Sequence, residues 1–234
     1  MKTRICILGL PRSGSQYVAS LIRSSTRGML DLAEPFTNRQ STRVALDDNN
    51  QVIKWEEAGE ISMEDRVEKL LTTLEAGDKD QPIIFRFFPY SDIPNIEQTI
   101  QRIKNCNFEF LVLNRNDTIA QVLSYGMALA TDVWTVNNEG YTPPTVEIRD
   151  FELMVWLYQS IKNFPNWLDS LGITYDVVNY ETAVSELFNY LGRPVYNVRV
   201  TVKKQSDSNI WNYIINKKEV EIFLESLKNE TYVY

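Results

Sequence analysis

The chain has 234 residues, enough for one large domain with a sizeable hydrophobic core, and we expect residues 1–234 to form that single domain. Hydrophobic residues make up 44% of the sequence, but no apolar run approaches the roughly 18 residues that a membrane-spanning helix needs, so we expect no membrane partner. The net charge of −7 argues against nucleic acid as a general partner, although it leaves room for a local basic pocket.

The first predicted elements are a strand, a glycine loop and a helix. Residues 4–8 form a short apolar run typical of a buried strand, and residues 17–22 carry apolar side chains at helical spacing. Between them lies a loop that contains Gly9 and Gly14. This arrangement directs backbone N–H groups and a helix N-terminus at one small volume, which favours the binding of phosphate or sulfate oxygens.

The loop differs from a nucleoside-triphosphate P-loop, which reads Gly, four residues, Gly, Lys, and then Ser or Thr. Gly9 and Gly14 keep the spacing, but Ser15 stands in place of the Lys, and Gln16 stands in place of the hydroxyl that would hold Mg²⁺. The positive charge is instead inside the loop, at Arg12. We interpret the loop as an anion cradle that uses no metal. The alternative is a strand–helix turn with an ordinary basic residue.

The rest of the chain alternates predicted strands and helices. Further strands are expected over residues 82–88, 108–113 and 173–178, and helices over 62–76, 94–104, 117–130, 148–165 and 181–191. Residues 27–60 are mixed and polar with a turn at 47–50, and Pro165 is expected to break or kink its helix. The alternation predicts an α/β fold of three layers, with a parallel sheet covered by helices on both faces. Ligands of such folds bind beyond the carboxyl ends of the strands, where the glycine loop is.

A second candidate site follows the strand at 108–113. Arg115 comes at the end of this strand, and Ser124 follows nine residues later, about two turns into the next helix. An arginine and a hydroxyl that converge from a strand end and its helix suit a phosphate monoester. The alternative is a surface arginine and a helix capped by Asp117.

Two later stretches are less specific. Tyr180 follows the strand at 173–178, where an aromatic ring either stacks on a base or fills the core. The polar loop at 203–208 includes Lys204 and Gln205 and either closes over a phosphate or is solvated surface.

The sequence also limits the redox and acid–base chemistry. Cys6 and Cys106 lie in or beside apolar runs, so buried reduced thiols and a cytoplasmic location are expected. The chain contains no histidine. A proton acceptor must therefore be a carboxylate, or less readily a Lys, Tyr or Cys.

Taken together, these stretches resemble the sulfotransferases that use 3′-phosphoadenosine 5′-phosphosulfate. Residues 11–15 resemble their 5′-phosphosulfate loop, 115–124 their 3′-phosphate motif, 178–194 their strand–Tyr-Glu–helix–Leu-Gly-x-Pro segment, and 204–206 the late loop that closes over the nucleotide. The spacing looks most like the bacterial trehalose 2-sulfotransferase branch. The resemblance implies a P-loop-like fold and a metal-free transfer of a sulfonate to a hydroxyl acceptor, with 3′,5′-adenosine bisphosphate as the product.

The resemblance also implies roles for particular residues. Arg12 would stabilise charge on the leaving 5′-phosphate, Arg115 and Ser124 would hold the 3′-phosphate, and Tyr180 would lie near the adenine. The remaining cofactor-binding residues that it implies are Pro11, Ser13, Gly14, Ser15, Gln16, Lys204 and Gln205.

The catalytic residues that the resemblance implies are Arg12, Arg86 and Glu34. Arg86 matches a lysine that touches the sulfonate in many members, whereas Phe88 stands where those members have a histidine base. Glu34, in Glu-Pro-Phe, matches the glutamate that serves as base in the bacterial branch. The alternative is an exposed loop glutamate.

Two other functions remain open from the sequence alone. One is a P-loop kinase or another nucleoside-triphosphate enzyme, and the other is a nucleotide-binding protein of the same fold without catalysis. The acceptor class is equally open between sugar, lipid, small phenol and peptide. The loops at 35–60 and 131–147 are expected to shape its pocket, with Trp55, Trp134 and Tyr141 as lining residues.

Overall fold

The computed structural model describes residues 3–36, 42–56, 62–89, 93–134, 142–195 and 210–230. Three of the residues named above, Tyr141, Lys204 and Gln205, lie outside these ranges, and the side chain of Trp55 is likewise not described. Within the described ranges, no helix is both long and apolar enough to cross a membrane.

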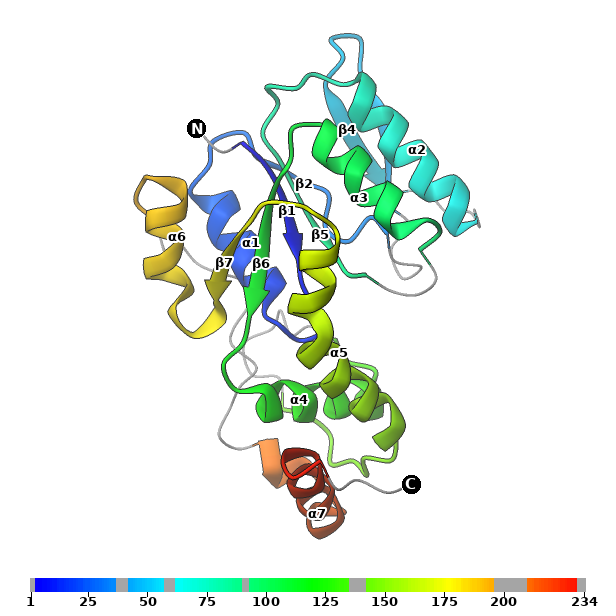
Figure 1. Cartoon of the computed structure of the whole chain (residues 1–234), viewed down its shortest axis with the longest axis vertical. Coiled ribbons are helices and arrows are strands. Elements are labelled where there is room, and N and C mark those ends of the chain that lie inside the picture. The colour runs from blue at the N-terminus through cyan, green and yellow to red at the C-terminus, as the bar shows by residue number, and fades with distance from the viewer. Residues whose placement is uncertain are drawn as a thin grey trace.

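Five parallel strands form the central sheet, in the order β2-β5-β1-β6-β7 (Figure 1). They are β1 (Arg4–Leu8), β2 (Leu30–Asp31), β5 (Ile83–Phe87), β6 (Glu109–Asn114) and β7 (Tyr175–Asn179). The central strand β1 is buried along its whole length, as expected for a parallel sheet that is covered on both faces. A separate antiparallel pair consists of β3 (Thr42–Leu46) and β4 (Val52–Glu56).

Helices cover both faces of the sheet, which confirms the predicted α/β fold. The α-helices are α1 (Ser15–Ser24), α2 (Met63–Ala76), α3 (Ile96–Asn105), α4 (Thr118–Thr131), α5 (Phe151–Ser170), α6 (Ala183–Leu191) and α7 (Lys217–Lys228). Short 3₁₀ turns occur at Tyr180–Thr182 and Ile210–Tyr213. Alternate residues of β1 face opposite layers: Ile5 and Ile7 pack with α1 and α6, whereas Cys6 and Leu8 belong to the larger cluster with α2, α3 and α5.

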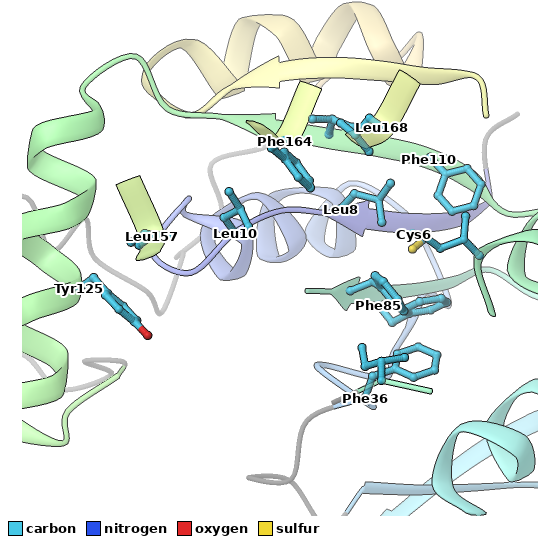
Figure 2. Packing of buried hydrophobic residues seen from close by; sticks show 14 of the residues in the cluster. Cys6, Leu8, Leu10, Phe36, Phe85, Phe110, Tyr125, Leu157, Phe164 and Leu168 are labelled. Carbon is cyan, nitrogen blue, oxygen red and sulfur yellow. The ribbon is translucent and has the colours of Figure 1, made fainter. Parts of the chain in front are cut away.

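The helices α4 and α7 lie beyond the carboxyl ends of the strands (Figure 1). The helix α4 packs closely on α5. Gly126 permits this approach, because a Cβ atom there would lie only 2.6 Å from the sulfur of Met154. Figure 2 shows that the larger hydrophobic cluster extends from Phe110 on β6, past Leu10, to Tyr125 on α4. The core therefore connects the sheet to α4 at the end where the glycine loop lies.

Pro165 was expected to break or kink its helix, and the expected break was wrong. The helix α5 does not end at Pro165 but continues to Ser170. Pro165 is exposed, so water can hydrate the backbone carbonyl that proline leaves unpaired, while Phe164 and Leu168 anchor both sides of it in the core. The region 27–60, for which the sequence predicted only a turn at 47–50, also contains β2 and the β3–β4 pair. The turn is present, because the N–H of Asn50 donates to the carbonyl of Asp47 at 3.0 Å.

Candidate anion-binding site

The loop after β1 contains a tight turn with a strained residue. The N–H of Ser13 donates to the carbonyl of Leu10 at 3.2 Å, and Arg12 has φ of 64°. Pro11 suits the second position of such a turn, and the third position, with positive φ, normally favours glycine. An arginine there costs of order 1 kcal/mol. The surrounding structure therefore holds Arg12 in place against its backbone preference.

Gly14 connects this turn to α1, and both its conformation and its surroundings require glycine. Its φ is 88°, and a Cβ atom would lie 2.2 Å from Cδ2 of Tyr180. The N–H of Val18 donates to the carbonyl of Gly14 at 3.1 Å, so the N–H groups of residues 15–17 precede the helical hydrogen-bond ladder. The first turn of α1 carries no acidic residue. These donors, at the positive end of the helix dipole, are suited to an anion.

Two arginines meet beside the loop. Arg12 donates from Nε to Oγ of Ser124 at 3.0 Å and from Nη1 to the carbonyl of Trp134. Arg115 donates from Nη1 to the carbonyl of Arg12 at 3.1 Å, and its guanidinium lies 5.4 Å from the ring centre of Tyr180. The structure thus brings Arg12 together with Arg115 and Ser124, from segments that are more than 100 residues apart.

The electrostatics of this cluster favour a negatively charged ligand. Burial first, and the nearby charge of Arg115 second, lower the pKa of Arg12 to about 10. Arg12 remains a cation at neutral pH because this pKa is well above 7. Among the described residues, no carboxylate contributes to the pKa shift of Arg12. In the part of the chain that the structure describes, the two positive charges are therefore arranged without a carboxylate that shifts the pKa of Arg12.

Several buried polar atoms near the loop have no hydrogen-bond partner within the described structure. They are Oγ of Ser13, Oε1 of Gln16 and Nε of Arg115. The Ser13 side chain matters most, because the residue is only 2% exposed. Buried polar groups are nearly always paired, so these atoms fit a site completed by a polar ligand. The donors Ser13 and Arg115 suit phosphate or sulfate oxygens in particular.

Glu34 and Arg86 form a second cluster at the same end of the sheet. Nη1 of Arg86 lies 2.9 Å from Oε1 of Glu34, and the N–H of Arg86 donates to the carbonyl of Ala33 at 2.8 Å. Arg86 pairs in register with Ile7 of β1, so this cluster lies on the β5 side of β1. Arg115 and Ser124 follow β6, on the other side. The glycine loop after β1 therefore starts between the two clusters.

Tyr180 is placed next to the loop but is largely covered. Its ring is 7% exposed, contacts Tyr17 edge-on at 5.8 Å between ring centres, and lies against Gly14. The ring thus lies near both the start of α1 and Arg115. Its contact with adenine stays a prediction, as do the roles of Lys204 and Gln205, which lie outside the described residues.

Sequence reasoning missed two contacts of the loop. Nε2 of Gln121, on α4, donates to the carbonyl of Pro11 at 2.8 Å, and the Trp134 carbonyl accepts from Arg12. The only signal for Gln121 was a polar residue on a mostly apolar helix. The Trp134 contact had no signal, because a backbone carbonyl is the same in every residue.

The comparison with known proteins does not extend this description: no family model and no curated protein matches the chain. Across the described ranges, no group of three or more His, Cys, Asp or Glu side chains is arranged to hold a metal ion.

Proposed function

We propose that the protein is a sulfotransferase that moves a sulfonate from 3′-phosphoadenosine 5′-phosphosulfate to a hydroxyl acceptor, on a P-loop-like fold. The observation that carries the proposal is the pair Arg12 and Arg115, which meet at the glycine loop. Among the described residues, no carboxylate contributes to the pKa shift of Arg12, so this charge is open to a ligand anion. A donor nucleotide with a 3′-phosphate and a 5′-phosphosulfate has two anionic ends. Two separate arginines match it better than one does.

The order of the strands supports the position of this site. Numbered in chain order, the parallel strands lie 2-3-1-4-5. The connection after β1 leads to one side of the sheet, and the connection after β6 leads to the other. Ligands of open α/β sheets bind at such a switch point, beyond the carboxyl ends of the strands. Arg12 and Arg115 follow the two strands that define it.

In the proposed reaction, the residues position the reactants and stabilise charge. Arg12 and the N–H groups at the start of α1 hold the phosphosulfate end and stabilise charge on the leaving phosphate oxygen. The acceptor oxygen forms a bond to sulfur while the bond from sulfur to the phosphate oxygen breaks. Glu34 takes the proton of the acceptor hydroxyl, and Arg86 orients the Glu34 carboxylate through their 2.9 Å ion pair.

Isothermal titration with 3′,5′-adenosine bisphosphate in the presence of EDTA tests the donor site. We expect binding without metal, and we expect Arg115→Met to weaken it by about 1.5–3 kcal/mol, the range for hydrogen bonds to a charged group. Arg102→Met is the matched control, because Arg102 lies in a surface ion-pair network between α2 and α3. Binding of ATP only with Mg²⁺ would contradict the proposal and favour the nucleoside-triphosphate alternative. The absence of any nucleotide binding would contradict both.

A second measurement tests the base. Glu34→Gln keeps the shape of the side chain but removes its ability to accept a proton. We expect transfer from radiolabelled donor to fall at least about 10²-fold while nucleotide affinity is unchanged. Glu225→Gln, at an exposed carboxylate of α7 paired with Lys228, serves as the control. A Glu34→Gln variant as active as the parent would exclude Glu34 as the base.

A further inference from the structure

Gln121 makes an unusual contact for a residue on an apolar helix. Its side chain is 3% exposed, and its Nε2 donates to the carbonyl of Pro11 at 2.8 Å across the boundary between α4 and the glycine loop. Because a peptide unit is planar, with its C=O and N–H pointing in opposite directions, the bond that holds the Pro11 carbonyl also fixes the direction of the Arg12 N–H.

The next carbonyl of the loop is held in the same way. Arg115 donates to the carbonyl of Arg12 at 3.1 Å, so two consecutive carbonyls of the turn are bound by side chains from the segment 115–121. A carbonyl oxygen that faced an anion would repel it. Binding both oxygens to protein donors keeps these dipoles away from the anion. Each of these two peptide units also has an N–H group. The N–H of Ser13 closes the turn by donating to the carbonyl of Leu10, whereas the N–H of Arg12 makes no hydrogen bond within the described structure.

We propose that Gln121 is a positioning residue of the anion cradle: by holding the Pro11 carbonyl, it orients the Arg12 N–H as a donor to the bound anion. The inference rests on the proposed function only in that the loop binds phosphate or sulfate oxygens. It does not depend on the nucleotide or on the acceptor. The residue acts through the backbone of the loop and does not touch the ligand.

The test uses the full chain and two probes, inorganic sulfate and 3′,5′-adenosine bisphosphate. Gln121→Met keeps the length of the side chain and its fit to a helix but removes the donor. We expect both probes to bind about 3- to 10-fold more weakly, the loss of one hydrogen bond. In ¹⁵N-resolved NMR spectra, sulfate should shift the Arg12 amide of the parent, and this shift should be lost in Gln121→Met while the Gly14 amide still responds.

A matched control comes from α3. Thr99 is also buried, and its hydroxyl donates to the carbonyl of Pro94 at 3.3 Å, far from the loop in sequence. Thr99→Val therefore removes a similar bond and should leave both affinities and the Arg12 shift unchanged. If Gln121→Met binds like the parent, or if Thr99→Val weakens binding equally, the role of Gln121 is wrong.

A second variant keeps the test decisive if Gln121→Met folds poorly. Gln121→Asn keeps the amide but shortens the side chain by one methylene, so the amide no longer reaches the Pro11 carbonyl, and no charge is introduced beside Arg12 and Arg115. It should weaken both probes and remove the Arg12 shift as Gln121→Met does. Parent-like binding by folded Gln121→Asn would overturn the inference. A parent that binds sulfate but not adenosine bisphosphate would contradict only the proposed nucleotide.

Discussion

At the scale of single residues, Arg12 combines a backbone conformation that favours glycine with the charge that the site needs. Its φ of 64° is unfavourable for any residue with a Cβ, and the residue is half-buried, with its charge near that of Arg115. A strained conformation of this kind persists only where contacts with the rest of the structure hold the residue in place, and such positions are common at functional sites. The strain and the charge can be separated by substitution.

We expect Arg12→Gly to be more stable than Arg12→Ala by about 1 kcal/mol, because glycine adopts a positive φ without strain whereas alanine does not. Both variants lack the guanidinium, so both should lose most of the affinity for 3′,5′-adenosine bisphosphate. Urea unfolding measures the first quantity and titration calorimetry the second. Equal stabilities would mean that the turn relaxes when the arginine is removed.

At the scale of elements, the sequence predicted those parts whose pattern is local. The helix expected over 62–76 is α2 (Met63–Ala76), which begins after Ser62, whose hydroxyl accepts from the N–H of Asp65. The β3–β4 pair could not be predicted in the same way, because its strands are short and mixed in character and their pairing depends on packing against α2. Likewise, Arg12, Arg115 and Ser124 belong to recognisable motifs, whereas Gln121 gains its role only when α4 folds against the loop.

The contact between α2 and α3 predicts a pH dependence of stability. Arg102 on α3 makes ion pairs with Glu68 at 2.6 Å and Glu75 at 2.7 Å, and these hydrogen bonds lower the pKa of both carboxyl groups. A carboxyl group with a lowered pKa in the folded state stabilises the fold above its unfolded pKa of about 4.3, and this contribution is lost as the pH falls through the folded value.

Arg102→Met should therefore be less stable than the parent at pH 7, and the difference should shrink below about pH 4. Urea unfolding of both proteins at pH 7, 5 and 3 measures this difference in the free energy of unfolding. Arg149→Met breaks an exposed pair outside this contact and should show a much smaller change. A difference independent of pH would assign the effect of Arg102 to packing of its side chain.

At the scale of the whole molecule, the sheet order connects segments that are distant in sequence. The loop after β1 and the segment after β6 meet at one end of the sheet, and α4 closes this end (Figure 1). A ligand held by Arg12 and Arg115 bridges both segments, so its binding should stabilise them together.

Hydrogen exchange monitored by mass spectrometry can detect this coupling. We expect 3′,5′-adenosine bisphosphate to slow exchange in residues 9–17 and 115–124 at the same ligand concentration, and to leave the strands at 44–46 and 52–53 unchanged. Protection of only one of the two segments would mean that the ligand does not bridge them.

The hydrogen bonds of Arg12 have a consequence for selectivity. Its guanidinium is bound by the hydroxyl of Ser124 and the carbonyl of Trp134, which act as an internal competitor for any anion that enters. A weakly bound monovalent ion such as chloride gains little by displacing them, whereas a multivalent phosphate ester gains enough to do so. Because an incoming anion must displace these two acceptors to bind Nε and Nη1 of Arg12, we expect the arginine to favour multivalent anions over chloride.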